Sequence, residues 1–355
     1  MQQLDELLDF LIAQQGSDLH LLAGQPPVIR RFGELRAIDR QPLSRRQTQD
    51  MVTGILSPRI RDTFAAYDQA DFAYVRGGGD RYRVNVFRHL GGTGAIFRSI
   101  PAAAPRLEDL QLPATVANIC LQRQGLILVT GKTGSGKSTT LAAMVDYINR
   151  RIHGHILTIE DPIEFVHGRK KCLISQREVG EHASGFASAL RSALREDPDV
   201  VLVGEMRDLD TISLAVTAAE TGILVMGTLH TNSAAASVDR IINTFPADKQ
   251  GHVRTMLSTS LRGIISQQLI PHREGEGMVA AVEILLNTAA TANAIREGKI
   301  EQLENIIQGG ALVGMQSMDN ALRALLDERR ISGDAAYEAA VLKSQFEHHR
   351  GTAHG

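Results

Sequence analysis

Residues 126–139 read LILVTGKTGSGKST, an apolar run followed by a glycine-rich turn that ends in Gly136-Lys137-Ser138. The turn fits the pattern GxxxxGK[ST], and it stands where that motif must stand, after a predicted strand and before a predicted helix. Glycines allow consecutive backbone N–H groups to turn toward a phosphate, and the helix N-terminus adds its positive dipole. The stretch therefore predicts a nucleotide-binding loop in an α/β fold, with a glycine-rich turn that binds no nucleotide as the alternative.

Two side chains of this turn carry specific chemistry. We expect the ammonium group of Lys137 to reach the β- and γ-phosphates and the hydroxyl group of Ser138 to bind Mg²⁺. The other residues contribute backbone amides around the phosphates. The predicted binding loop comprises Gly131, Lys132, Thr133, Gly134, Ser135, Gly136, Lys137, Ser138 and Thr139.

Three further apolar runs follow at residues 156–159, 200–203 and 223–229, separated by helical patterns. This alternation is typical of a buried, largely parallel sheet. In such a sheet, ligands bind at the carboxyl ends of the strands. Polar residues directly after each run are therefore candidates for the site.

Carboxylates follow two of these runs. Glu205 comes after the second run, where P-loop proteins place the acidic group that stands beside the metal ion and the attacking water. Three carboxylates, the last of them Glu164, follow the first run, and Pro162 stops that strand so that the loop can face the site. Mg²⁺ or a positioned water would relieve their mutual repulsion. A strand that ends in an acid by chance, or a solvated acidic turn, is the alternative.

The last run ends in GTLHTN at residues 227–232. A histidine at the carboxyl end of a strand is well placed to hydrogen-bond a γ-phosphate, so His230 is a candidate sensor of the nucleotide. A structural histidine that caps the strand is the alternative.

The chain before the glycine-rich turn reads as a separate small domain. Leucines at helical spacing predict a first helix that ends near Gly16, and short strands alternate with helices up to Ile100. The segment PAAAP at residues 101–105 has no periodicity and predicts a linker. The predicted organisation is an N-terminal domain at residues 1–100, a linker at 101–112, a second domain with C-terminal helices at 113–345 and a disordered tail at 346–355.

Composition narrows the class of protein. No apolar run reaches the ~18 residues of a membrane helix, and the first residues are acidic and amphipathic, so we expect a cytoplasmic protein without a transmembrane segment. Cys120 and Cys172 are the only cysteines and form no CxxC pair, so we expect no zinc site. A net charge of -2 gives no general attraction to nucleic acid.

Four motifs, taken in order, resemble the Walker A, Asp box, Walker B and His box of the type II/type IV secretion ATPases. Similarity extends over nearly the whole chain, and it is greatest to the branch that retracts type IV pili (the PilT-type branch). The resemblance implies a PAS-like N-terminal α/β domain followed by a RecA-like P-loop ATPase domain with a helical C-terminal appendage. The motifs are TGKTGSGKSTT (130–140), IEDPIEF (159–165), VLVGEMRD (201–208) and GTLHTNSA (227–234), and the further similar segments are GSDLHL (16–21), RYRVNVF (81–87) and GMQSMDNAL (314–322).

By this resemblance, the chain hydrolyses ATP to ADP and phosphate as a ring of six identical subunits. Glu164 and Glu205 help to place or activate the water, and His230 couples the γ-phosphate to conformation. Mg²⁺ binds to Ser138 and to Glu205, and its contact with Glu205 is either direct or through a water molecule. An inner-membrane pilus platform protein is the implied partner, which would bring the cytoplasmic motor to the inner membrane.

Two arginines of the first domain gain a role only from the resemblance. Arg83 and Arg98 lie on predicted strands, and from the residues alone they indicate a solvated strand face. In related motors, arginines on equivalent strands reach across the subunit boundary, where a guanidinium group stabilises charge on the γ-phosphoryl group.

Rival functions share part of this pattern. A pilus assembly or type II secretion ATPase has the same chemistry but usually carries a four-cysteine zinc module, and a short type IVB secretion motor stays open. Residues 294–297 resemble only the second half of the AIRNLIRE motif of retraction motors, since Ala292 stands where that motif has its first arginine. A RecA-like nucleic-acid translocase would need a basic channel or stacking aromatics, whereas aromatics are 4% and tryptophan is absent, so nucleic acid is not an expected partner.

Overall fold

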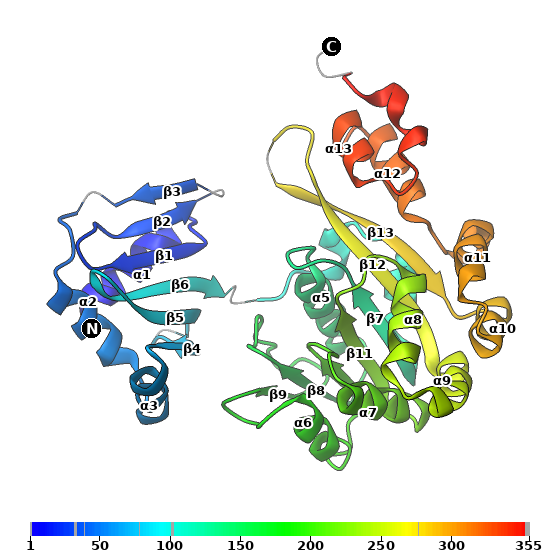
Figure 1. Ribbon diagram of the computed structural model, residues 1–355, viewed down its shortest axis with the longest axis horizontal. Coiled ribbons are helices and arrows are strands. Elements are labelled where there is room, and N and C mark those ends of the chain that lie inside the picture. The colour runs from blue at the N-terminus through cyan, green and yellow to red at the C-terminus, as the bar shows by residue number, and fades with distance from the viewer. Residues whose placement is uncertain are drawn as a thin grey trace. The chain divides into compact units, whose positions relative to one another are not determined.

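The computed structural model describes residues 2–31, 34–38, 40–77, 79–100, 103–275 and 277–351. The chain divides into two compact units, Met1–Ala103 and Ala104–Gly355, and each is described by itself. Both units combine a sheet with helices (Figure 1), which confirms the predicted α/β class. Within the described part of the chain, no helix is both long enough and apolar enough to cross a membrane.

A six-stranded antiparallel sheet forms the first unit, in the order β3-β2-β1-β6-β5-β4. Three helices pack on one face of it. Leu4, Leu7, Leu8 and Leu11, which lie on one side of α1, are fully buried there. Its elements are α1 (Gln2–Ala13), β1 (Asp18–Leu22), β2 (Val28–Arg31), β3 (Glu34–Ala37), α2 (Arg45–Ile55), α3 (Pro58–Tyr67), β4 (Gln69–Val75), β5 (Arg81–His89) and β6 (Gly92–Ile100).

A seven-stranded sheet organises the second unit, in the order β13-β12-β7-β11-β10-β8-β9. Six strands are parallel, and β13 joins the edge antiparallel to β12. Its strands are β7 (Gly125–Thr130), β8 (His155–Glu160), β9 (Leu173–Glu178), β10 (Val200–Val203), β11 (Leu224–Leu229), β12 (Leu261–Pro271) and β13 (Met278–Leu286). Its helices are η1 (Leu107–Leu110), α4 (Ala114–Cys120), α5 (Lys137–Asn149), α6 (Phe186–Ala193), α7 (Leu209–Glu220), α8 (Ala234–Thr244), α9 (Ala247–Ser260), α10 (Ala289–Glu297), η2 (Ile300–Gln302), α11 (Leu303–Gly309), η3 (Ala311–Val313), α12 (Met318–Asp327), α13 (Gly333–Ala339), η4 (Lys343–Gln345) and η5 (Glu347–His349).

Both faces of this sheet are covered, as the apolar runs predict. Leu126 and Leu128 of β7 pack toward α7, α8 and α9, whereas Ile127 and Val129 pack toward α4 and α5. Every residue of β7 is buried. A strand buried on both faces cannot alternate apolar and polar residues, which explains the continuous apolar run before the glycine-rich loop.

The β12–β13 hairpin was not among the predicted strands, and it supports the C-terminal helices. Ile270 and Val279 of the hairpin form a separate core with α12, α13 and Phe346. Phe346 is 1% exposed, although it lies in the tail predicted to be disordered. The ring finds an apolar surface on the helices before it, which sequence spacing did not reveal. Residues 352–355 of that tail lie outside the described residues.

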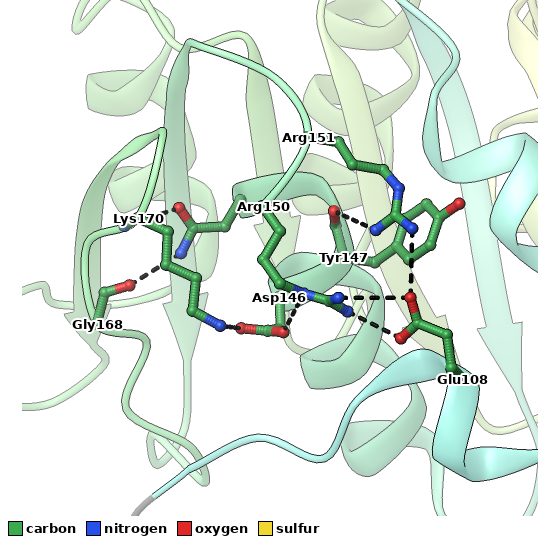
Figure 2. A network of polar contacts seen from close by, with 8 residues as sticks. Glu108, Asp146, Tyr147, Arg150, Arg151, Gly168 and Lys170 are labelled. Carbon is green, nitrogen blue, oxygen red and sulfur yellow. Dashed lines mark hydrogen bonds and ion pairs between the residues drawn. The ribbon is translucent and has the colours of Figure 1, made fainter.

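A network of charged side chains fixes the start of the second unit to α5 (Figure 2). Glu108 of η1, within the predicted linker, accepts hydrogen bonds from Arg150 at 2.9 Å and Arg151 at 3.3 Å. Asp146, one turn earlier than Arg150, accepts from Arg150 at 2.9 Å and from Lys170 at 2.5 Å. Leu107 beside Glu108 is buried against α5, so this part of the predicted linker belongs to the second unit.

The network also makes the stability of the second unit depend on pH, and the direction of this dependence can be derived. Hydrogen bonds, chiefly from Arg150, lower the pKa of Glu108 from 4.5 to about 2. A carboxyl group whose pKa is lower in the folded than in the unfolded chain stabilises the fold above its ordinary pKa. The contribution of Glu108 is therefore present above about pH 4.5 and is lost as the pH falls toward 2.

We expect Asp146→Ala to lower the free energy of unfolding of the second unit by about 1–3 kcal/mol, because it removes a largely buried acceptor from two cations. Denaturant unfolding followed by circular dichroism measures the change. The control is Glu338→Ala, whose exposed carboxylate pairs with Lys343 at 3.6 Å and should contribute less than about 0.5 kcal/mol. Equal losses in the two variants would contradict a structural role for the network.

Candidate active site

The glycine-rich loop joins the carboxyl end of β7 to Lys137, the first residue of α5. Gly131, Gly134 and Gly136 have φ angles of 146°, 80° and 85°, a region that residues with side chains rarely adopt. A Cβ atom on Gly131 would lie 2.4 Å from the carbonyl oxygen of Gln267, and one on Gly136 would lie 2.7 Å from its Nε2 atom. The loop can therefore take this course only with glycine at these positions.

Gln267 of β12 holds the loop from the side. Its Nε2 atom donates to the carbonyl oxygen of Ser135 at 2.8 Å, and its Oε1 atom accepts from the hydroxyl group of Thr140 at 2.8 Å. The side chain is buried. Sequence reasoning missed Gln267, and the only available signal was a pair of glutamines, Gln267 and Gln268, within an otherwise apolar stretch.

The ammonium group of Lys137 lies inside the loop. It donates to the carbonyl oxygens of Gly131 and Lys132, both at 2.9 Å. Burial lowers the pKa of Lys137, and the negative charges of Glu205 and Glu164 oppose this change. Lys137, Glu164 and Glu205, from three separate segments of the chain, are thus within range to interact electrostatically.

Glu205 directly contacts the His box. Its Oε1 atom lies 3.0 Å from Nε2 of His230, and its carboxylate also pairs with the guanidinium group of Arg207. The predicted Walker B and His box residues are therefore neighbours. Sequence reasoning gave Arg207 no role, although it stands only two residues beyond Glu205.

Two hydrogen bonds, one from a side chain and one between backbone groups, tie three strand ends together at this site. The hydroxyl group of Thr228 on β11 donates to the carbonyl oxygen of Gly204 at 2.5 Å. The N–H group of Gly204 donates in turn to the carbonyl oxygen of Ile159 on β8 at 2.7 Å. These bonds place the segments after β8, β10 and β11 side by side, and they hold Glu205 between the other two.

The acidic loop after β8 separates its carboxylates into two environments. Glu160 accepts a hydrogen bond from Thr158 at 2.7 Å, and burial raises the pKa of Glu160. Glu164 is exposed, and the loop beside it is held by Glu178 of β9, which accepts from the N–H group of Ile163 at 3.1 Å. Glu160 thus supports the loop, whereas Glu164 is accessible to water.

The residues present fit the phosphates of a nucleotide. A pocket of about 420 Å³ is lined by residues 131–135, Asn232 and Gln267 among others. The Oγ atom of Ser135 is buried without a hydrogen-bond partner among the described residues. An inward-facing glycine loop, an ammonium group and an unsatisfied hydroxyl group together suit a phosphate chain. The hydroxyl group of Ser138 and the carboxylate of Glu205 are oxygen ligands of the kind that Mg²⁺ prefers.

A second pocket, of about 500 Å³, adjoins the first turn of α5. Gly136 and Thr139 line one side of it, and Leu110, Leu112 and Leu269 contribute apolar surface. Thr139, which is predicted to bind the nucleotide, therefore lines a recess of mixed polar and apolar surface next to the glycine-rich loop.

Arg83 and Arg98 lie together in the first unit. They are directly opposite each other on β5 and β6, and both are exposed. The Nε atom of Arg98 donates to the carboxylate of Asp18 on β1 at 2.8 Å. Because the helices of this unit pack on the other face of the sheet, the two arginines share the face opposite those helices.

Comparisons with known proteins agree with this geometry. Residues 96–321 match the family described as Type II/IV secretion system protein. The type IV pilus retraction ATPase PilT of Pseudomonas aeruginosa is 50% identical over 341 residues, which cover 96% of this chain and 99% of that protein. A twitching motility protein of Neisseria gonorrhoeae is 49% identical over 314 residues, which cover 88% and 84%.

A solved structure extends the similarity to three dimensions. The crystal structure of the pilus retraction motor PilT with bound ADP matches with a TM-score of 0.90 and 44% identity, covering 96% of this chain and 97% of that one. The family match spans more than half of the chain, and the relatives align along nearly all of it. The chain therefore belongs to the Type II/IV secretion system protein family, in its PilT-type branch.

Proposed function

We propose that this protein is a motor ATPase that hydrolyses ATP to ADP and phosphate in order to retract type IV pili, and so supports twitching motility. The observation that carries the proposal is the ammonium group of Lys137 inside a glycine-rich loop that suits phosphates, where Glu164 and Glu205 act on its charge. Full-length similarity to the pilus retraction ATPase of Pseudomonas aeruginosa supports retraction over other uses of the same chemistry.

The chemistry follows from the placement of each group. The loop amides and the ammonium group of Lys137 bind the β- and γ-phosphates, and the recess beside Thr139 has room for the nucleoside. Mg²⁺ held by Ser138 and Glu205 would neutralise phosphate charge. Glu205 and Glu164 orient a water molecule, and Glu205 accepts its proton while the water oxygen bonds to the γ-phosphorus and the bond to ADP breaks. His230, already in contact with Glu205, is placed to respond when the γ-phosphate is lost.

We also propose a ring of six identical subunits in which Arg83 and Arg98 act on the ATP of a neighbour. Two exposed guanidinium groups in register on the same face of the sheet can bind the same anionic group. The ring would work in the cytoplasm and reach the inner membrane through a pilus platform protein. ATP-driven movement of each second unit would then act on that partner.

Glu205→Gln should bind ATP as tightly as the wild type but hydrolyse it at least ~100-fold more slowly, because the amide keeps the shape of the side chain and cannot accept the proton. Phosphate release and fluorescent-nucleotide binding measure the two properties. Glu220→Gln is the control. Glu220 ends α7 just before β11 begins, so it lies near the amino ends of the strands, whereas Glu205 follows a carboxyl end. Wild-type turnover in Glu205→Gln would refute the assignment.

The same variant tests the cellular role. In a strain without its own retraction motor, the wild-type gene should restore twitching and Glu205→Gln should leave pili accumulated on the surface. An active ATPase that fails to restore twitching would refute pilus retraction while leaving ATP hydrolysis intact.

The double variant Arg83→Ala/Arg98→Ala should lose turnover but keep ATP binding. Mixed with Glu205→Gln protein, it should regain activity, because mixed rings contain sites with an intact Glu205 and intact arginines from the neighbour. Arg88→Ala, on the opposite face of β5 where Arg88 pairs with Asp68, should leave turnover unchanged. Mixed rings that stay inactive at every ratio would contradict action between subunits.

A further inference from the structure

Glu283 is a buried carboxylate outside the predicted site. It lies within β13 and is 9% exposed. The strand register places it opposite Ser266 of β12, and Ser266 opposite Thr130 of β7. The hydroxyl groups of Ser266 and Thr130 are 2.9 Å apart. These three polar side chains form one row across three strands, at the point where β7 ends and the glycine-rich loop begins.

Helix α8 packs on β12 and β13 next to this row (Figure 1). The Oε1 atom of Glu283 accepts a hydrogen bond from the N–H group of Ala234 at 2.7 Å. The hydroxyl group of Ser237, one turn along α8, bonds to that of Thr231 at 2.6 Å and reaches that of Thr130 at 3.5 Å. Ala234 is the first residue of α8. The polar row therefore fixes the start of the helix that follows the His box.

The same carboxylate also meets a second helix. Met318 begins α12, and its N–H group favours the charged form of the Glu283 carboxylate and so lowers its pKa. Just before it, Gln316 exchanges backbone hydrogen bonds of 2.8 and 3.1 Å with Ile284 of β13. The start of α12 is thus aligned along the strand that carries Glu283.

Electrostatics explain why a carboxylate is tolerated at this place. Burial raises the pKa of Glu283, and the amides of Ala234 and Met318 oppose this effect, while Glu304 and Asp319 reinforce it. The first N–H groups of a helix lack acceptors within the helix, and the helix dipole favours negative charge there. One carboxylate is therefore hydrogen-bonded to the start of α8 and interacts electrostatically with the first amide of α12, so a shift of either helix changes the surroundings of the same carboxylate.

We propose that Glu283 is a positioning residue for ATP hydrolysis. It holds the start of α8, and with it His230 against Glu205. It also links the segment that precedes α8 to α12. The inference rests on the ATPase function proposed above. The glycine-rich loop makes no hydrogen bond to Glu283 among the described residues, whereas His230, which contacts Glu205, lies in the short segment between β11 and the start of α8. Loss of Glu283 should accordingly lower kcat more than it weakens ATP binding.

Steady-state hydrolysis and nucleotide binding test this on the purified full chain. We expect Glu283→Ala to lower kcat at least tenfold while the Kd for ATP stays within about threefold of the wild type. Glu283→Gln keeps one acceptor oxygen for Ala234 and should recover part of the loss. Should the alanine variant not fold, Glu283→Gln compared with wild type carries the same test, with a fall in kcat at unchanged Kd as the supporting result.

Asp319 provides a matched control. Its buried carboxylate accepts from the N–H groups of Val341 and Leu342 at 2.8 and 3.0 Å, so Asp319→Ala also removes a buried acceptor from α12 but keeps the hydrogen bond from Ala234 to Glu283. It should lower the unfolding temperature and leave kcat within about twofold. Equal falls in kcat for both variants, or an unchanged kcat in Glu283→Ala, would overturn the proposal.

Hydrogen exchange measures the link itself. In the wild type, a non-hydrolysable ATP analogue should slow amide exchange at residues 231–237 and 315–322 together, and in Glu283→Ala only the first segment should respond. Independent behaviour of the segments in the wild type would overturn the coupling. A wild-type protein with no ATPase activity would instead refute the proposed function, so the two failures are distinguishable.

Discussion

The ammonium group of Lys137 lies among the backbone carbonyl oxygens of the glycine-rich loop. A buried cation is costly in free energy unless hydrogen-bond acceptors and opposite charges surround it. Two loop carbonyls supply the acceptors, and Glu164 and Glu205 supply the charge. Since these carboxylates follow β8 and β10, both strands must end on the same side of the sheet as β7, which the parallel arrangement provides.

The sheet and α5 connect the glycine-rich loop to regions of the chain that lie far from the phosphates. Gln267 holds the loop from β12, and the same strand continues into the hairpin that supports α12 and α13. On the other side, α5 ends in the network that fixes Glu108 at the start of the second unit. A change at the glycine-rich loop therefore has direct physical routes to the C-terminal helices and to the segment that precedes α4.

Much of the fold and the centre of the site could be predicted because their signals are local. The apolar runs correspond to β7, β8, β10 and β11, and the motif residues after them lie together at the carboxyl ends of these strands. β9, β12 and β13 were not predicted, because edge strands and hairpins that mix apolar and polar residues resemble helices in short windows. Gln267 and Glu283 were missed for another reason: each acts through contacts with residues distant in sequence, and no local pattern marks such contacts.

Binding of Mg²⁺-ATP to Lys137→Ala, measured by calorimetry beside the wild type, tests the nucleotide site most directly. Removal of an ammonium group that forms charge-assisted bonds to phosphate should weaken binding by at least about tenfold. The circular dichroism spectrum should stay that of the wild type, because the loop keeps its glycines and its bonds to Gln267. Binding within threefold of the wild type by a correctly folded variant would contradict the account.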